Sequence, residues 1–242
     1  EIFPVLNAMF QRIYGHSPYK SPTDMGVNMA GNCICDDAAC RDASCQEIIP
    51  RYYDARRRAL AGKCSEEEVY KIEMLMNQAG ITVHDRPVVD VALSRAEETE
   101  APAAALELAD GRMITGKTTD LLGPCAALLL NALKELAGIP HSQPVISPAA
   151  IEPIQTLKTQ YLGSKNPRLH MDEVLIALSV SAASDPNAQK ALEQLPNLKG
   201  CQAHTSVMVS DVDRKLFMKL SIQATFEAKY ENNSVIFPKK GI

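Results

Sequence analysis

Long hydrophobic runs are missing from this chain. Its longest uninterrupted apolar stretch within 242 residues is Cys125–Leu130, whereas a membrane-spanning helix needs about 18 or more apolar residues. The sequence begins at Glu1 without a signal-like segment, so we expect no secretory signal. We therefore expect no membrane span and a cytoplasmic location. The first residue is not Met, which leads us to expect a piece of a longer protein.

An excess of either charge is missing as well. Lys and Arg number 25 and Asp and Glu number 29, so the formal net charge is −4, and the longest basic block is Arg56–Arg58. This balance argues against nucleic-acid binding. With 46% apolar and 22% charged residues, the composition is that of a globular protein and excludes disordered and collagen-like classes.

Standard metal and protease motifs are absent too. The sequence contains no H-E-x-x-H and no G-x-S-x-G. Its seven cysteines are an odd number, which does not suit a secreted disulfide scaffold and favours a reducing compartment. Four of them fall within thirteen residues without the C-x2-C spacing typical of metal ligands: Cys33, Cys35, Cys40 and Cys45. We predict no metal site, although a zinc or iron–sulfur role for this cluster stays open.

The hydrophobic pattern changes at the acidic, Pro102-containing segment 97–103. Before it, the spacing of apolar residues predicts helices over 2–14, about 37–58, 65–80 and 85–97. We place a domain boundary there, with a helical region over 1–98 and an α/β domain over 99–242. In the second domain we expect strands at 103–108, 112–116, 144–146, 201–209 and 222–229. Helices are expected at 121–137, 147–162, 171–183, 186–195 and 210–220.

This order, ββαβα(αα)βαβ over residues 103–229, resembles the cytidine-deaminase-like three-layer α/β fold with a mixed sheet. Those enzymes begin one helix with C-A-E or H-A-E and the next with P-C-x-x-C, which supply the zinc ligands and a proton-shuttling Glu. Here Cys125-Ala126-Ala127 stands at the first place and Pro148-Ala149-Ala150-Ile151-Glu152 at the second. The resemblance therefore implies the fold without zinc-dependent deamination.

A second resemblance covers nearly the whole chain. The runs EIFPVLNAMFQRIYGHSPYKSPTDMGVNMAGNCI, EEEVYKIEMLMNQAGI and SKNPRLHMDEVLIALS are similar to the C-terminal half of a bacterial family, domain of unknown function 1846. That likeness implies a missing N-terminal half, an α/β region with a phosphate-loop-like segment, as the partner of this chain. It names no reaction and no cofactor.

Two segments carry residues suited to binding an anion. Gly111–Thr118 fits the phosphate-loop pattern G-x4-G-K-[ST], but Asp110-Gly111 equally predicts a hairpin turn. Lys117 and Thr118 are candidates for binding an anion in either arrangement, and a plain hairpin that ends at Gly116 is the alternative. The polar loop 21–32 holds further candidate ligand-binding residues, whose alternative role is helix capping: Thr23, Asp24 and Asn28.

Acid–base chemistry is suggested by the segment 164–173 and by one strand. Lys165, Asn166 and Arg168 are candidates for binding phosphate or carboxylate, and His170 beside Asp172 is a candidate general base. A capped helix with solvated charges is the alternative for this segment. His204 lies in an expected strand and is either catalytic or a hydrogen-bonded core residue.

Two functions fit these observations. The chain is either part of an enzyme acting on a nucleotide or phosphorylated metabolite, with its active site shared with the missing half, or a non-catalytic scaffold or regulatory module. Helices rich in Ala and Leu, such as 126–137, need partners over wide faces, so we expect a homo-oligomer in either case.

Overall fold

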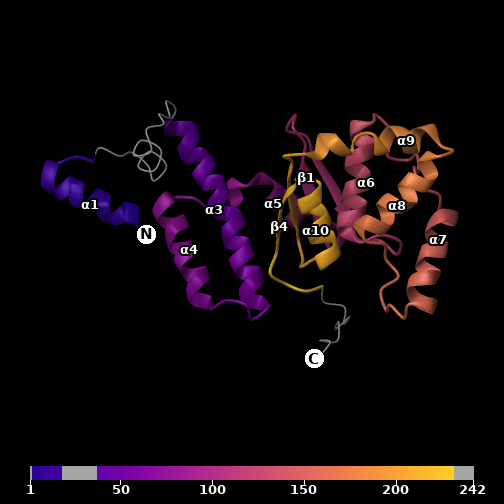
Figure 1. The fold of residues 1–242 in the computed structure, drawn as a ribbon, viewed down its shortest axis with the longest axis horizontal. Helices are drawn as coiled ribbons and strands as arrows, with labels where there is room; N and C mark the ends of the chain where they lie inside the picture. Colours follow the sequence, from indigo (N-terminus) through magenta and orange to yellow (C-terminus); the bar gives the residue numbers. More distant parts are fainter. Residues whose placement is uncertain (1, 18–36, 232–242) are drawn as a thin grey trace.

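A mixed four-stranded sheet lies at the centre of the computed structural model, which describes residues 2–17 and 37–231 (Figure 1). The strands stand in the order β2-β1-β3-β4. Their bounds are β1 (Ala103–Glu107), β2 (Met113–Lys117), β3 (Gln202–Thr205) and β4 (Gln223–Phe226). β1 pairs antiparallel with both β2 and β3, whereas β3 and β4 are parallel. The α/β class predicted from the sequence is confirmed.

Helices form the N-terminal part of the chain, and two of them cover one face of the sheet. They are α1 (Ile2–Tyr14), α3 (Asp37–Leu60), α4 (Glu66–Ala79), the short 3-10 turn η1 (Val83–Asp85) and α5 (Pro87–Thr99). α5 packs on β1, β2 and β3, and α3 packs on both α4 and β4 (Figure 1). Pro50 lies inside α3 and does not end it.

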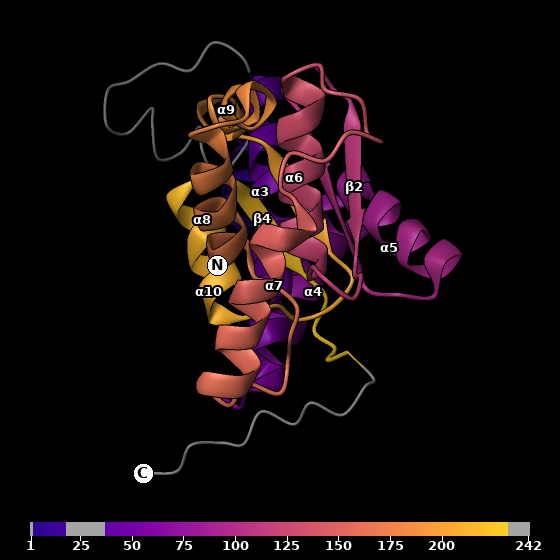
Figure 2. The same cartoon turned by 90° about the vertical axis from the view of Figure 1, so that its right-hand side faces the viewer.

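The remaining helices cover the opposite face (Figure 2). They are α6 (Pro124–Leu136), α7 (Pro148–Thr156) with the π-helical turn η2 (Leu157–Tyr161), α8 (Met171–Ala182), α9 (Pro186–Leu192), η3 (Leu195–Leu198) and α10 (Asp211–Lys219). α6 and α10 contact the strands, and α8 packs on both of these helices. The largest hydrophobic core lies between these layers and includes Leu106, Leu128, Leu133, Leu178 and Phe217. None of the described helices has the length and apolar composition needed to cross a bilayer.

The segment Gly111–Thr118 is a hairpin arm and not a phosphate loop. Gly111 has φ +83° in the turn between β1 and β2, a conformation that glycine adopts without strain. Residues Met113–Lys117 then pair along the whole of β1. Their backbone is an extended edge strand paired with β1 and does not form a loop that could surround phosphate, so the hairpin interpretation is confirmed.

One expected strand does not form. Pro144–Ile146 is irregular, although Val145 and Ile146 are buried. Three residues that begin with proline offer few backbone donors to a ladder, and their apolar side chains join the core without pairing. The described sheet therefore has four strands and not five, and the cytidine-deaminase-like fold is not confirmed.

β2 and α6 approach each other closely at Gly116. A Cβ added there would lie 2.8 Å from the carbonyl carbon of Ala127 and nearer still to the backbone of Leu128. Backbone atoms cannot move aside as a flexible side chain can. Only glycine lets α6 pack against this strand at the observed distance.

We predict that Gly116→Ala lowers the free energy of unfolding by about 3 kcal/mol or more, because the strand and helix must separate. For a chain of this size the melting temperature should fall by on the order of 10 °C. Gly123→Ala is the matched control, since its Cβ would meet only the carbonyl oxygen of Leu169 at 3.7 Å. Equal melting temperatures for the two variants would contradict the close-approach argument.

Candidate functional site

The N-termini of three helices meet beyond the carboxyl ends of β2 and β3. α6 follows β2 and α10 follows β3 in the chain. The backbone N–H of Gly123, just before α6, donates to the carbonyl of Leu169, just before α8, at 3.2 Å. The N–H of Met171 in α8 donates to Asp213 Oδ1 in α10 at 2.8 Å. The carboxyl edge of an α/β sheet is where ligands commonly bind, and helix N-termini carry partial positive charge.

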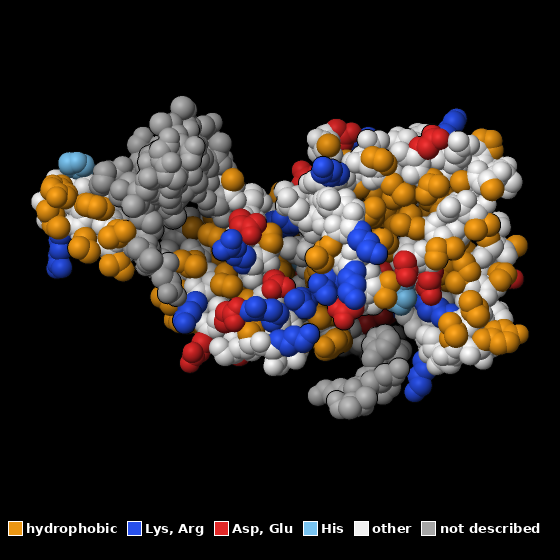
Figure 3. All heavy atoms as spheres, viewed as in Figure 1, with side chains coloured by type: hydrophobic (Ala, Val, Ile, Leu, Met, Phe, Trp, Pro, Cys, Tyr) orange, Lys and Arg blue, Asp and Glu red, His pale blue; other side chains and the backbone are white. Residues whose placement is uncertain are grey.

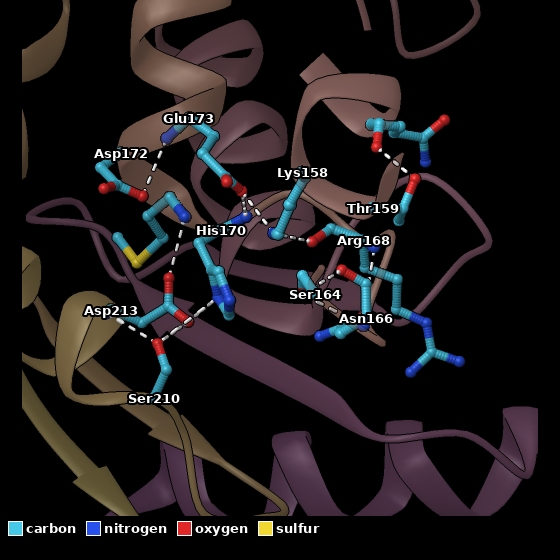
Figure 4. Close-up of polar contacts among 12 residues, drawn as sticks. Lys158, Thr159, Ser164, Asn166, Arg168, His170, Asp172, Glu173, Ser210 and Asp213 are labelled. Carbon is cyan, nitrogen blue, oxygen red and sulfur yellow. Dashed lines mark hydrogen bonds and ion pairs between the residues drawn. The ribbon is translucent and has the colours of Figure 1, made fainter. Parts of the chain in front are cut away.

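His170 and Asp213 form a hydrogen-bonded pair at this junction (Figure 4). Nδ1 of His170 lies 2.9 Å from Asp213 Oδ2. The hydroxyl of Ser210 donates to the same carboxylate oxygen at 2.8 Å and accepts from the backbone N–H of Asp213 at 3.1 Å. Asp213 is buried, whereas the side chain of His170 is 25% exposed. Nε2 of His170 has no hydrogen-bond partner among residues 2–17 and 37–231.

The pairing shifts the proton affinity of both groups. The hydrogen bond to Asp213 raises the pKa of His170 and outweighs the opposing effect of burial. Burial by itself would raise the pKa of Asp213, but the hydrogen bonds and charge of His170, together with the N–H of Met171, bring that pKa below its usual value. The imidazolium–carboxylate form is therefore favoured.

A buried lysine fixes the backbone on both sides of His170. Lys158, in the π-helical turn η2, donates to Glu173 Oε2 at 2.7 Å and to the carbonyl of Arg168 at 2.6 Å. Glu173 Oε2 also accepts from the backbone N–H of His170 at 2.7 Å. These contacts leave His170 little freedom at the start of α8 (Figure 4).

Arg168 lies two residues before His170, in the segment that leads into α8 (Figure 4). The residue between them, Leu169, is fully buried and forms a bridge with Leu122. Nη1 of Arg168 donates to Glu231 Oε1 at 2.8 Å, and the backbone N–H of Arg168 donates to Asn166 Oδ1 at 3.1 Å. Asn166 thus contacts the backbone of Arg168, whereas the side chains of Arg168 and His170 have different partners, Glu231 and Asp213.

Asp172 is not the partner of His170. Its Oδ1 accepts from the backbone N–H of Glu173 at 2.9 Å, because neighbouring residues at the start of a helix point in different directions. The carboxylate that meets His170 comes from Asp213, in a different helix. The predicted His170–Asp172 pairing is therefore corrected to His170–Asp213.

His204 lies on the other face of the sheet. It is inaccessible to solvent, its Nδ1 is 2.8 Å from Thr225 Oγ1, and its ring centroid is 4.8 Å from that of Tyr53 in α3. Burial lowers the pKa of His204, although Glu227 opposes this effect. Strand alternation sends its neighbour Ala203 into the core under α6 and α8. His204 thus does not join His170, and its contacts are those of a core residue.

The other candidates are dispersed or lie outside the described residues. Lys117 and Lys165 are exposed and form no ion pair with any residue that the structure describes. The hydroxyl of Thr118 is buried and has no partner there either. The described residues contain no group of three or more His, Cys, Asp or Glu placed to hold a metal ion. Outside the described residues lie Thr23, Asp24, Asn28, Cys33 and Cys35.

Two central residues of the site were not recognised as such from the sequence. Ser210 begins the helix expected over 210–220 and caps α10, with Asp213 three residues further on. Nothing in that spacing shows that the Asp213 carboxylate also reaches α8. No sequence pattern marks Lys158 as a buried residue of the site, because the π-helical turn that buries it has no characteristic sequence.

Comparison with known families finds two matches that together cover most of the chain. Residues 84–236 match the model described as domain of unknown function DUF1846, C-terminal, and residues 1–80 match domain of unknown function DUF1846, N-terminal. The expectation that the chain is only the C-terminal half is therefore wrong. The three sequence segments quoted above show that the chain resembles the family, but they do not show where the N-terminal domain of the family ends and the C-terminal domain begins.

Among curated relatives, the chain is 55% identical to UPF0371 protein DIP2346 of Corynebacterium diphtheriae over 97% of its own length and 47% of that protein. It is 53% identical to a UPF0371 protein of Corynebacterium glutamicum, over 97% of this chain and 48% of the relative. It is 52% identical to a UPF0371 protein of Streptococcus pneumoniae strain JJA, over 96% of this chain and 47% of the relative. The chain spans about half the length of these relatives.

We predict that Asp213→Asn lowers the free energy of unfolding at pH 6 by about 3 kcal/mol, because His170 loses a buried charged partner. The raised pKa of His170 adds stability that is complete below about pH 6.5, its unfolded pKa, and is lost as pH rises through the folded pKa. The lowered pKa of Asp213 adds stability that is lost in acid. The cost of the substitution should therefore shrink both above the folded pKa of His170 and below pH 4.

Urea unfolding between pH 3 and 9 measures this cost, and an NMR titration follows His170 directly. The matched control is Asp211→Asn in the same helical turn, whose carboxylate is exposed and pairs with Arg214. If both substitutions cost the same at every pH, the buried pair does not contribute as described.

Proposed function

This chain belongs to the DUF1846 family, and we propose that it supplies the acid–base site of an enzyme acting on a nucleotide or another phosphorylated small molecule. The observation that carries the proposal is the His170–Asp213 pair, with Nδ1 of His170 on a buried carboxylate and the ring partly exposed. A histidine held in this way by a carboxylate is a common arrangement in general acid–base catalysis.

In this pair the two ring nitrogens of His170, Nδ1 and Nε2, have different roles. Asp213 accepts the Nδ1–H of His170 and so fixes the ring and its tautomer. Nε2 is then left as the atom that takes or gives a proton at the substrate. Because Asp213 raises the pKa of His170, the ring holds a proton more readily near neutral pH than an unpaired histidine does. The site is thus suited to donating a proton to a leaving group.

Three features support an anionic substrate. Arg168 stands two residues before His170 in the same segment, and a guanidinium can bind phosphate through two parallel hydrogen bonds. The N-termini of α8 and α10 add partial positive charge beside it. The Arg168–Glu231 ion pair is partly exposed, and such pairs contribute little stability. A substrate phosphate can therefore displace Glu231 from Arg168.

A non-catalytic scaffold or regulatory module is the second candidate function. The observation that favours it is α8, where Ile176 is 62% and Val180 is 67% exposed although the opposite side of the helix is buried. Helices that are apolar all round are usually buried in an assembly. Figure 3 shows hydrophobic side chains gathered over this part of the surface. The predicted homo-oligomer would cover such a face.

Thermal melting against pyrophosphate, ADP and a sugar phosphate tests the proposed function. At about 100 times its dissociation constant, a ligand adds roughly 2.7 kcal/mol of stability, which raises the melting temperature by about 5–10 °C at this size. We predict that Arg168→Ala abolishes this rise. Glu231→Gln should enlarge it, because the carboxylate no longer competes for Arg168.

Arg95→Ala is the matched control, since Arg95 is also half-exposed and paired, with Glu98 on α5, away from the site. Once a substrate that the enzyme converts is identified, His170→Asn should lower kcat by about 10²–10⁴-fold. The same variant should keep the increase in melting temperature that the ligand causes. A rise that survives Arg168→Ala would refute the anion site. No rise with any phosphate compound would leave the scaffold as the better explanation.

A further inference from the structure

Helix α1 exposes an apolar stripe to solvent. Val5, Met9 and Ile13 are 59%, 50% and 63% exposed, and their i, i+4, i+8 spacing places them along one side of the helix. α1 stands apart from the sheet and its covering helices at the far end of the molecule (Figure 1). Orange hydrophobic atoms cover much of its visible surface in Figure 3.

An isolated helix of this length is not stable in water. α1 has 13 residues, and isolated helices of about 12–15 residues are marginal without packing of their apolar face. Its sequence nevertheless follows the helical period closely. The pattern therefore indicates a helix selected to pack against a surface that its stripe does not meet within the described residues.

The same part of the chain exposes a second apolar face. α4 packs on α3 with Val69 and Met76 buried, while Tyr70, Met74 and Leu75 are 62%, 43% and 42% exposed. Both helices lie in residues 1–80, which match the N-terminal model of the family. By contrast, the sheet domain encloses a large core of its own.

The length of the relatives identifies a covering partner. Each of the curated relatives described above contains about as much sequence again as this chain matches. We propose that the stripe of Val5, Met9 and Ile13 is the docking surface for the half of the full-length family chain that this sequence does not match. This interface is independent of the acid–base site and of the function proposed for it.

Hydrogen exchange in a full-length protein tests the interface without any substitution. Amide exchange is measured over residues 2–14 of this chain and over the matching segment of the full-length Corynebacterium diphtheriae relative. We expect exchange to be at least about 100-fold slower in the relative, because docking must open before the helix unfolds. Equally fast exchange in both proteins would overturn the proposal.

Substitutions then identify the face. Met9→Glu with Ile13→Glu keeps good helix formers and is placed in this chain and in a full-length chimera, in which this chain replaces the matching part of the relative. We expect no change in melting temperature in the chain alone and a fall of several degrees in the chimera. The matched control is Ile176→Glu with Val180→Glu on α8, a similarly exposed pair.

The other results each contradict the proposal. A chain that is dimeric by light scattering, and monomeric after the α1 substitutions, would show that a second copy covers the stripe. A chimera destabilised by the α8 pair and not by the α1 pair would place the interface on the other face. A chimera insensitive to both pairs would show that the stripe stays in solvent.

Discussion

The buried carboxylate of Asp213 joins two helices that are separated by 28 residues between their nearest ends. One oxygen accepts the N–H of Met171 at the start of α8, and the other meets His170 and Ser210. A charge at this depth is stable only when it is fully hydrogen-bonded. The same three contacts that satisfy the charge also fix the ring of His170, so folding and the candidate chemistry depend on one group.

Around this carboxylate the structure is held by close packing. The absence of a side chain at Gly116 lets α6 lie directly on β2, and this sets where the α6 N-terminus stands relative to Leu169. Lys158 and Glu173 fix the segment that carries Arg168 and His170 from the other side. These contacts restrict the short stretch of chain that carries Arg168 and His170.

Much of the local structure could be predicted from the sequence. The apolar period indicated the helices, Asp110-Gly111 indicated the hairpin, and Ser210 indicated the start of α10. Each of these signals concerns contacts within a few residues. The strand expected at Val145 and Ile146 did not form. A short apolar run gives the same sequence pattern whether its backbone pairs in a sheet or only its side chains are buried in the core.

Within the site, the sequence determined which residue types stand near the start of each helix. It placed His170 at the start of α8 and Arg168 two residues before it. Only the tertiary structure decided that Asp213 and not Asp172 meets His170, and that His204 lies across the sheet. The physical reason is that the two long-range contacts join residues far apart in the chain. His170 and Asp213 are 43 positions apart. Tyr53, which meets His204, comes from α3 in the N-terminal part of the chain. Their geometry follows from how α6, α8 and α10 pack, which no local spacing encodes.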